Sequence, residues 1–168
     1  MEERSKMKLM ANPYSRLDGY NCFGCSPDNN DGLQMEFYTD GEIVICEWDP
    51  KPQFQGYVNV LHGGIQSTLI DEIACWLVHA KLKTSGVTSS LNVRYLKPVP
   101  SNEGKIKLTA TLEQMRKNLA DVKVELFSNS GIKCAEGLVT YFTFPLEYAK
   151  KKLHFPDPEL FFTDIEKS

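Results

Sequence analysis

The chain has 168 residues, of which 42% are hydrophobic and 24% are charged, and its formal net charge is −3. This composition predicts one soluble globular domain with a sizeable core. The acidic balance and the lack of any lysine- or arginine-rich run exclude general affinity for nucleic acid. No stretch reaches the roughly 20 apolar residues that span a bilayer, and the charged start does not resemble a signal peptide. We therefore expect a cytoplasmic protein that does not interact with membranes.

The N-terminal residues 1–20 are predicted to be a leader, because their apolar residues are few and irregular. The turn-rich stretch 21–32 follows and contains Cys22 and Cys25. A Cys-x-x-Cys pair can form half of a zinc site or a redox pair. However, the three histidines are scattered singly and no second cysteine pair follows. We therefore predict that Cys22 and Cys25 bind no metal.

Two strands are predicted next, over Leu33–Thr39 and Glu42–Trp48, because both stretches are rich in β-branched and aromatic residues. The dipeptide Asp40-Gly41 between them is a strong hairpin signal, so the strands should pair in antiparallel fashion. Prolines end the second strand, and the connection 53–61 then leads to a helix.

A long helix is predicted over Ile65–Lys83, ended by Gly86 at its C-terminal cap. Its middle is apolar on all sides, which is typical of a helix buried by its surroundings. The acidic pair Asp71 and Glu72 interrupts this apolar run, so Asp71 should be largely buried. A buried carboxylate is costly unless it is hydrogen-bonded or its pKa is shifted. Asp71 is thus a candidate for catalysis, and a capped structural aspartate is the alternative.

The helix is preceded by His62, Gly63 and Gly64. Glycines let the backbone approach a ligand closely, and the first helical turn presents unpaired N–H groups at the positive end of the helix dipole. Such a turn can stabilise a developing oxyanion. The alternative is that the two glycines merely permit tight packing between a strand and the helix.

After the helix the apolar period changes from helical to alternating. Four strands are predicted over Val87–Lys97, Lys105–Met115, Ala120–Phe127 and Ile132–Phe144, followed by a short helix over Leu146–Leu153. Two strands, one buried helix and four strands do not alternate as a parallel α/β fold requires. The predicted fold class is α+β, with one curved antiparallel sheet of about six strands wrapped around the long central helix.

The chain resembles the hotdog-fold acyl-CoA thioesterases, in particular their PaaI-like branch. The resemblance is carried by Leu61-His62-Gly63-Gly64 with Asp71, by the stretch Ser90–Pro100 and by Ala135-Glu136-Gly137. It extends from residue 21 to residue 144, so we expect residues 21–144 to form the domain and residues 145–168 to form a C-terminal extension.

The resemblance implies hydrolysis of an acyl or aryl thioester of coenzyme A, with no metal and no bound cofactor. In such enzymes the N–H of the glycine after the histidine polarises the thioester carbonyl, which points to Gly63 here. The helix carboxylate acts as general base or nucleophile, which points to Asp71. A hydroxyl early in the next strand helps to place the water, which points to Thr88. His62 in such motifs orients the loop and contacts the thioester, or has only a structural role.

Further candidates concern substrate binding. Gly64 lies in the same turn as Gly63, where the backbone can approach a ligand closely. The related thioesterases carry Asn or Gln where this chain has Gly56, and the neighbouring Gln55 is a weak substitute for that residue. The acidic phosphates of coenzyme A require local positive charge, which basic residues at or beyond the strand ends can supply. These residues are Arg94, Lys97, Arg116 and Lys117.

Gly63 and Asp71 are eight residues apart, which separates them by roughly 12 Å along a helix. They cannot both reach one carbonyl, so we expect the site to be shared between two chains of a homodimer, or of a dimer of dimers. Two other functions remain open: a dehydratase or hydratase with the same fold, and a non-catalytic acyl-CoA binding module.

Overall fold

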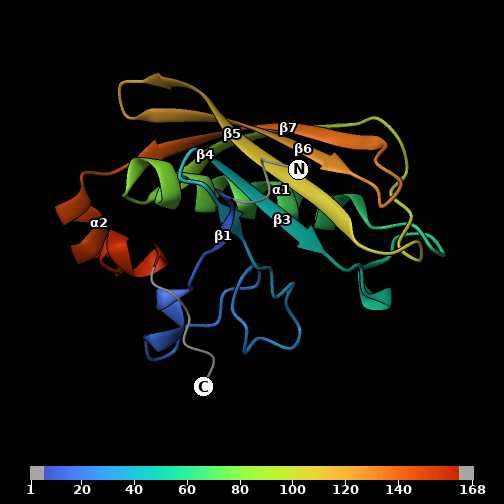
Figure 1. Ribbon diagram of the computed structural model, residues 1–168, viewed down its shortest axis with the longest axis horizontal. Coiled ribbons are helices and arrows are strands. Elements are labelled where there is room, and N and C mark those ends of the chain that lie inside the picture. The colour runs from blue at the N-terminus through green and yellow to red at the C-terminus, as the bar shows by residue number, and fades with distance from the viewer. Residues whose placement is uncertain (1–5, 163–168) are drawn as a thin grey trace.

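The computed structural model describes residues 6–162. A seven-stranded antiparallel sheet, in the order β1-β2-β3-β5-β6-β7-β4, curves around the helix α1 (Gly63–Leu77) (Figure 1). The fold confirms the predicted antiparallel sheet around a long central helix. The strands are β1 (Lys8–Leu9), β2 (Tyr38–Thr39), β3 (Ile43–Trp48), β4 (Gly86–Tyr95), β5 (Ile106–Arg116), β6 (Leu119–Phe127) and β7 (Lys133–Thr143).

Shorter helical segments lie outside the sheet. A π-helical turn η4 (Val78–Leu82) continues α1, and α2 (Leu146–Leu153) follows the last strand. The 3-10 turns are η2 (Pro13–Arg16), η3 (Pro52–Phe54) and η5 (Pro158–Phe162). None of the helices within residues 6–162 is long and apolar enough to cross a membrane.

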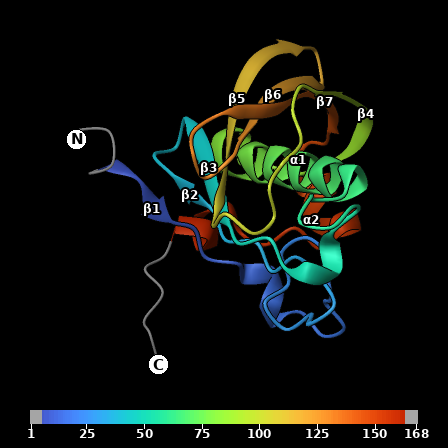
Figure 2. The ribbon, with the colours of Figure 1, turned by 90° about the vertical axis from the view of Figure 1, so that its right-hand side faces the viewer.

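The helix α1 is enclosed from two sides, which explains why its sequence is apolar all round. The concave face of the sheet covers one side, and the N-terminal segment with its loop covers the other (Figure 2). On this second side Trp76 stacks on Phe37 with ring centroids 4.6 Å apart. The buried residues of the sheet that belong to the core include Val44, Cys46, Ile106, Leu108, Ala110, Val122, Val124, Leu126 and Val139.

The sheet differs from the prediction at its first edge. The strand expected over Leu33–Thr39 is reduced to Tyr38–Thr39, because the backbone before it pairs with a loop: Leu33 N–H donates to Phe23 and Met35 N–H donates to Gly24. The hairpin is present, but Thr39 pairs with Val44, so its loop is longer than the Asp40-Gly41 dipeptide. The unpredicted strand β1 adds the seventh strand by pairing with β2.

The helix end also differs from the prediction. The left-handed residue after η4 is Lys83, with φ of 56°, whereas Gly86 begins β4. A Cβ at Gly86 would lie 2.2 Å from the carbonyl oxygen of Phe142 in β7. Gly86 is therefore needed for close strand pairing rather than for a helix cap.

His79 of η4 lies in an aromatic cluster with Tyr14, Trp76, Phe155 and Phe161. Segments from both ends of the described chain therefore meet at the end of the helix. His79 is 2% exposed, and this burial lowers the pKa of its imidazole from 6.5 to about 4. The Nδ1 nitrogen lies 3.1 Å from the carbonyl oxygen of Thr84, where it donates as a neutral ring.

We expect the neutral state of His79 to make stability depend on pH. Between pH 6.5 and 4 the unfolded chain binds a proton at this histidine and the folded chain does not, so stability falls as pH falls. By pH 4 this histidine lowers the free energy of unfolding by about 3 kcal/mol relative to neutral pH. Glu72 has the opposite effect on stability. Its pKa is raised to about 7, so near neutral pH the folded chain binds a proton at this carboxyl more readily than the unfolded chain does.

The measurement is therefore the difference in urea-unfolding free energy between the wild type and His79→Gln at pH 7 and at pH 4. We expect the wild type to lose about 3 kcal/mol more than the variant over this range. Equal losses would show that His79 is not held neutral in the folded protein.

Candidate active site

The N-terminal turn of α1 is organised by His62, its N-cap residue. His62 Nδ1 accepts a hydrogen bond of 2.9 Å from the Gly64 N–H, and the His62 carbonyl accepts one from the Gln66 N–H. Because Nδ1 is the acceptor, the neutral ring carries its proton on Nε2. Within residues 6–162 the Gly63 N–H makes no hydrogen bond. Of the two predicted glycines, Gly63 therefore has the N–H that a ligand can use.

The same turn is fixed by Tyr95 at the end of β4. The Tyr95 hydroxyl donates to the Gly63 carbonyl at 2.8 Å and lies 2.6 Å from the hydroxyl of Ser67. A Cβ at Gly63 would lie 3.5 Å from the Tyr95 ring, which is ordinary contact. The contact holds the start of the helix against the edge strand. Neither Tyr95 nor Ser67 was recognised from the sequence as a site residue, although the alternation of β4 placed Tyr95 on a common face with Val93.

Asp71 is half-buried and is held by two hydroxyl groups. Thr88 Oγ1 donates to Asp71 Oδ1 at 2.9 Å, and the Tyr141 hydroxyl donates to the same oxygen at 3.0 Å. Burial raises the pKa of Tyr141, so its hydroxyl stays protonated and can only donate to the carboxylate. Asp71 Oδ2 accepts no hydrogen bond within the described chain. The carboxylate is thus oriented through one oxygen, and the other oxygen can accept a proton or attack a carbon.

A β-bulge brings Thr88 to Asp71. The pairing of β4 with β7 shifts register between Thr88 and Ser90. Strict alternation places Thr88 and Tyr95 on opposite faces of the strand, but one extra residue reverses the alternation. Both side chains consequently point at α1, Thr88 at its middle and Tyr95 at its start. Tyr141 has no such local signal beyond its place on the inward face of the last strand.

Within one chain, the structure does not bring Gly63 and Asp71 together. Gly63 lies by Tyr95 at the end of β4, and Asp71 lies by Thr88 near its beginning. Gln55 stays near the helix start but is exposed, and its side-chain oxygen accepts from the Asn59 N–H in its own loop.

The four basic candidates are not gathered on one surface. Arg94 lies 3.0 Å from Glu136, and Arg116 at the tip of the β5–β6 hairpin forms an ion pair with the buried Asp121. Lys117 occupies the exposed turn of that hairpin with φ of 57°, and Lys97 is exposed beyond the end of β4. The hairpin tip and Lys97 belong to opposite ends of β4, since Leu119 pairs with Phe142 and Gly86 pairs with Thr143.

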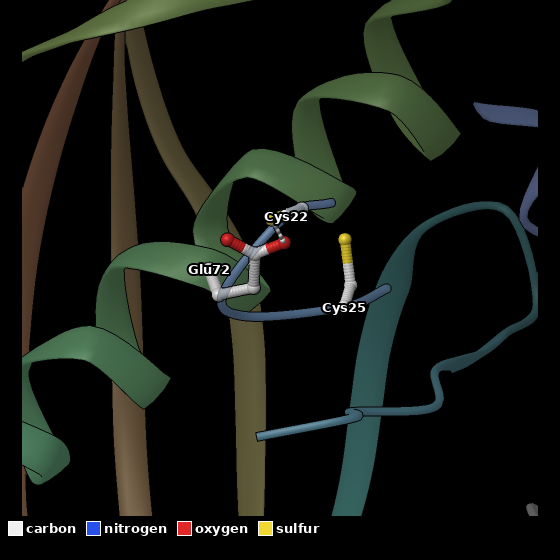
Figure 3. Close-up of side chains that lie close together, drawn as sticks. All are labelled: Cys22, Cys25 and Glu72. Atoms are coloured by element: carbon white, nitrogen blue, oxygen red, sulfur yellow. Dashed lines mark hydrogen bonds between the residues drawn. The ribbon is translucent and has the colours of Figure 1, made fainter. Parts of the chain in front are cut away.

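The second acid of the pair, Glu72, points toward the loop that carries Cys22 and Cys25 (Figure 3). Burial and the neighbouring Cys22 raise the pKa of Glu72 to about 7. The Cys25 thiol donates to Cys22 and, with backbone N–H groups, lowers the pKa of Cys22 to about 5. No local pattern connects these residues, because 50 positions separate Cys22 from Glu72.

Residues 58–135 match the family model of the thioesterase superfamily. Acyl-coenzyme A thioesterase 13 from Mus musculus is 33% identical over 86 residues, which are 51% of this chain and 61% of that protein. The chain thus matches less than two thirds of the length of this curated relative.

Solved structures share the fold. Thioesterase superfamily member 2 from Mus musculus is 30% identical with a TM-score of 0.55, over 60% of this chain and 74% of that one. A Bacillus halodurans protein, crystallised with CoA, is 27% identical with a TM-score of 0.55, over 67% of this chain and 72% of that one.

Proposed function

Since the chain belongs to the hotdog-fold thioesterase superfamily, we propose that it hydrolyses the thioester of an acyl- or aryl-coenzyme A to the free acid and coenzyme A. The observation that carries this proposal is the Asp71 carboxylate, which two hydroxyl donors hold by one oxygen while the other oxygen stays unpaired within residues 6–162. Hydrolysis needs a base or nucleophile of this kind and an oxyanion donor.

In the proposed reaction the thioester carbonyl accepts a hydrogen bond from the Gly63 N–H, whose place at the helix start favours developing negative charge. Asp71 then takes a proton from water as the water oxygen attacks the carbonyl carbon; the C–S bond breaks and the proton passes to the leaving thiolate of coenzyme A. Alternatively, Asp71 attacks the carbonyl carbon itself, the thiolate leaves, and water hydrolyses the resulting anhydride. Thr88 and Tyr141 keep the carboxylate in place. His62 fixes the turn through the Gly64 N–H, so we assign it a positioning role.

Coenzyme A as the thiol part of the substrate is supported by relatives. The similar Mus musculus protein is named an acyl-coenzyme A thioesterase, and the Bacillus halodurans protein was crystallised with CoA. Similarity to the PaaI-like branch extends the proposal to aryl as well as alkyl acyl groups.

The strand β4 supports a homodimer as the active form. It is ten residues long and forms one edge of the sheet. Its apolar residues Val87, Leu91 and Tyr95 are 46%, 39% and 52% exposed. A long exposed edge strand with apolar side chains is a ready template for pairing with another chain. We infer that two β4 strands pair in antiparallel fashion and extend the sheet across a two-fold axis.

This pairing would complete the site. The beginning of one β4 would lie beside the end of the other, so Asp71 and Thr88 of one chain would approach Gly63 and Tyr95 of the partner. The hairpin tip with Lys117 would approach the same region, and Lys97 would come from the partner. A dimer of dimers is compatible with this arrangement, because only the β4 edge is used.

The proposed activity is tested by measuring thiol release from a panel of acyl-CoA thioesters of graded length and from aryl-CoA thioesters. We expect hydrolysis of at least one class. Binding of acyl-CoA without thiol release from any of them would instead identify a non-catalytic acyl-CoA binding module.

We expect the coenzyme A end to be held by exposed positive charge at the hairpin tip. Lys117→Glu should raise KM by about fivefold or less, and the KM of the wild type should rise with salt, because exposed charge contacts are weak and screened. Lys117 is a cleaner test than Arg116, whose removal would leave Asp121 buried without its cation. The control is Lys105→Glu, which reverses the charge of an exposed lysine just before the start of β5, at the end of that strand away from the hairpin tip. A KM that is independent of salt and of Lys117 would exclude this contact.

A further inference from the structure

A second cluster of reactive side chains lies outside the proposed active site. The sulfur atoms of Cys22 and Cys25 and a carboxylate oxygen of Glu72 all lie within 4.8 Å of one another, and Cys22 Sγ is 3.7 Å from Glu72 Oε1 (Figure 3). Two thiols and a carboxylate are ligands that Zn²⁺ prefers. Tetrahedral zinc with bonds of about 2.0–2.3 Å separates its ligand atoms by about 3.5–3.8 Å. Only small movements would bring the three atoms to that spacing.

The backbone of the loop is shaped for this arrangement. The backbone N–H groups of Gly24 and Cys25 lie near the Cys22 sulfur, where they could donate to a metal-bound thiolate. A Cβ at Gly24 would lie 2.4 Å from Glu72 Cδ, so any larger residue here would push the Glu72 carboxyl away from its place beside the cysteines. The loop is fixed on its far side by the bond from Met35 N–H to the Gly24 carbonyl.

Neighbouring groups orient two of the three ligand side chains. Trp76 Nε1 donates to Glu72 Oε1 at 3.3 Å, and the Tyr20 hydroxyl lies 2.9 Å from Cys25 Sγ. Tyr20 in turn accepts from Asn12 Nδ2 at 3.3 Å. Metal ligands in proteins are commonly held by such outer hydrogen bonds. Cys25 and Trp76 also line a cavity of about 890 Å³, which lies beside the cluster.

We propose that Cys22, Cys25 and Glu72 form a zinc site, with water as the fourth ligand, which fastens the loop 20–35 to α1. The sequence alone predicts no metal here, because it offers no second pair of ligands close by. The fold supplies Glu72 as the third ligand. A disulfide between the two cysteines would use only two of the three groups and leave the Glu72 carboxyl enclosed without a cation.

The site is separate from the proposed hydrolysis. Glu72 is adjacent to Asp71 in sequence, but Asp71 points at Thr88 and Tyr141 on the sheet, whereas Glu72 points at the loop on the other side of the helix. The metal therefore acts on structure: it holds the loop against the helix that carries Asp71. Zinc binding and thioester hydrolysis can consequently be tested independently.

The test is zinc binding by the full chain, purified under reducing conditions, stripped with a chelator and dialysed against zinc chloride. Elemental analysis should find about one zinc per chain. Each of the variants Cys22→Ser, Cys25→Ser and Glu72→Gln should weaken binding about tenfold or more. Cys134→Ser is the matched control, because this buried cysteine lies in β7 and should leave binding unchanged.

Circular dichroism of each variant checks that the fold is retained. Should Glu72→Gln not fold, cobalt substitution of the wild type decides, because a tetrahedral cobalt ion with thiolate ligands has a characteristic charge-transfer absorption. Failure to bind zinc, binding that Glu72→Gln leaves unchanged, or a Cys22–Cys25 disulfide that forms in preference to the zinc complex would each overturn the proposal.

Discussion

Asp71→Asn should lower the turnover of the best acyl-CoA substrate by about 10²-fold or more, because that is the scale of removing a general base or nucleophile. The fold should be unaffected. The asparagine side-chain oxygen can still accept hydrogen bonds from Thr88 and Tyr141, which hold the aspartate in the native protein. The measurement is kcat by thiol release, together with circular dichroism and thermal unfolding of the variant.

The control for Asp71→Asn is Glu147→Gln, which makes the same chemical change at an exposed position on α2 and should leave kcat unchanged. Near-wild-type turnover of Asp71→Asn would assign the chemistry to another group, Glu72 being the nearest carboxylate in sequence.

Mixing two inactive variants should restore about a quarter of wild-type activity. The first variant is Asp71→Ala, which lacks the carboxylate, and the second is Gly63→Pro, which lacks the N–H. In the proposed dimer each site combines Gly63 of one chain with Asp71 of the other. A mixed dimer has one intact site of two, and half of the dimers are mixed after complete exchange of subunits.

The structure indicates that Gly63→Pro will fold. Residue 63 is the first of the helix, where proline is well tolerated, and His62 before it is extended with ψ of 136°, as the residue before a proline must be. Gly63→Ala is the control, because it keeps the N–H and its Cβ would only touch the Tyr95 ring at 3.5 Å. No recovery of activity, with subunit exchange confirmed by mass spectrometry, would place both groups of the site on one chain.

The sequence by itself determined the features that rest on local periodicity. Alternating apolar residues located β5, β6 and β7 to within one or two residues, and the run that is apolar on all sides identified α1 as a buried helix. The histidine before two glycines marked the start of that helix. These features are readable because each depends on neighbours within a few positions. The role of Gly86 in strand pairing was not readable, because it depends on close contact with Phe142 of β7.

Only the tertiary structure decided how the candidate residues meet. Thr88 reaches Asp71 because one extra residue in β4 reverses the strand alternation, and nothing in the local pattern of the strand requires that bulge. Tyr141 joins them from 70 positions away in the chain. Glu72 meets Cys22 and Cys25 because Gly24 lets the loop lie directly on the helix. Each meeting depends on packing between segments that are far apart in sequence, so periodicity and spacing, which are local, could not reveal them.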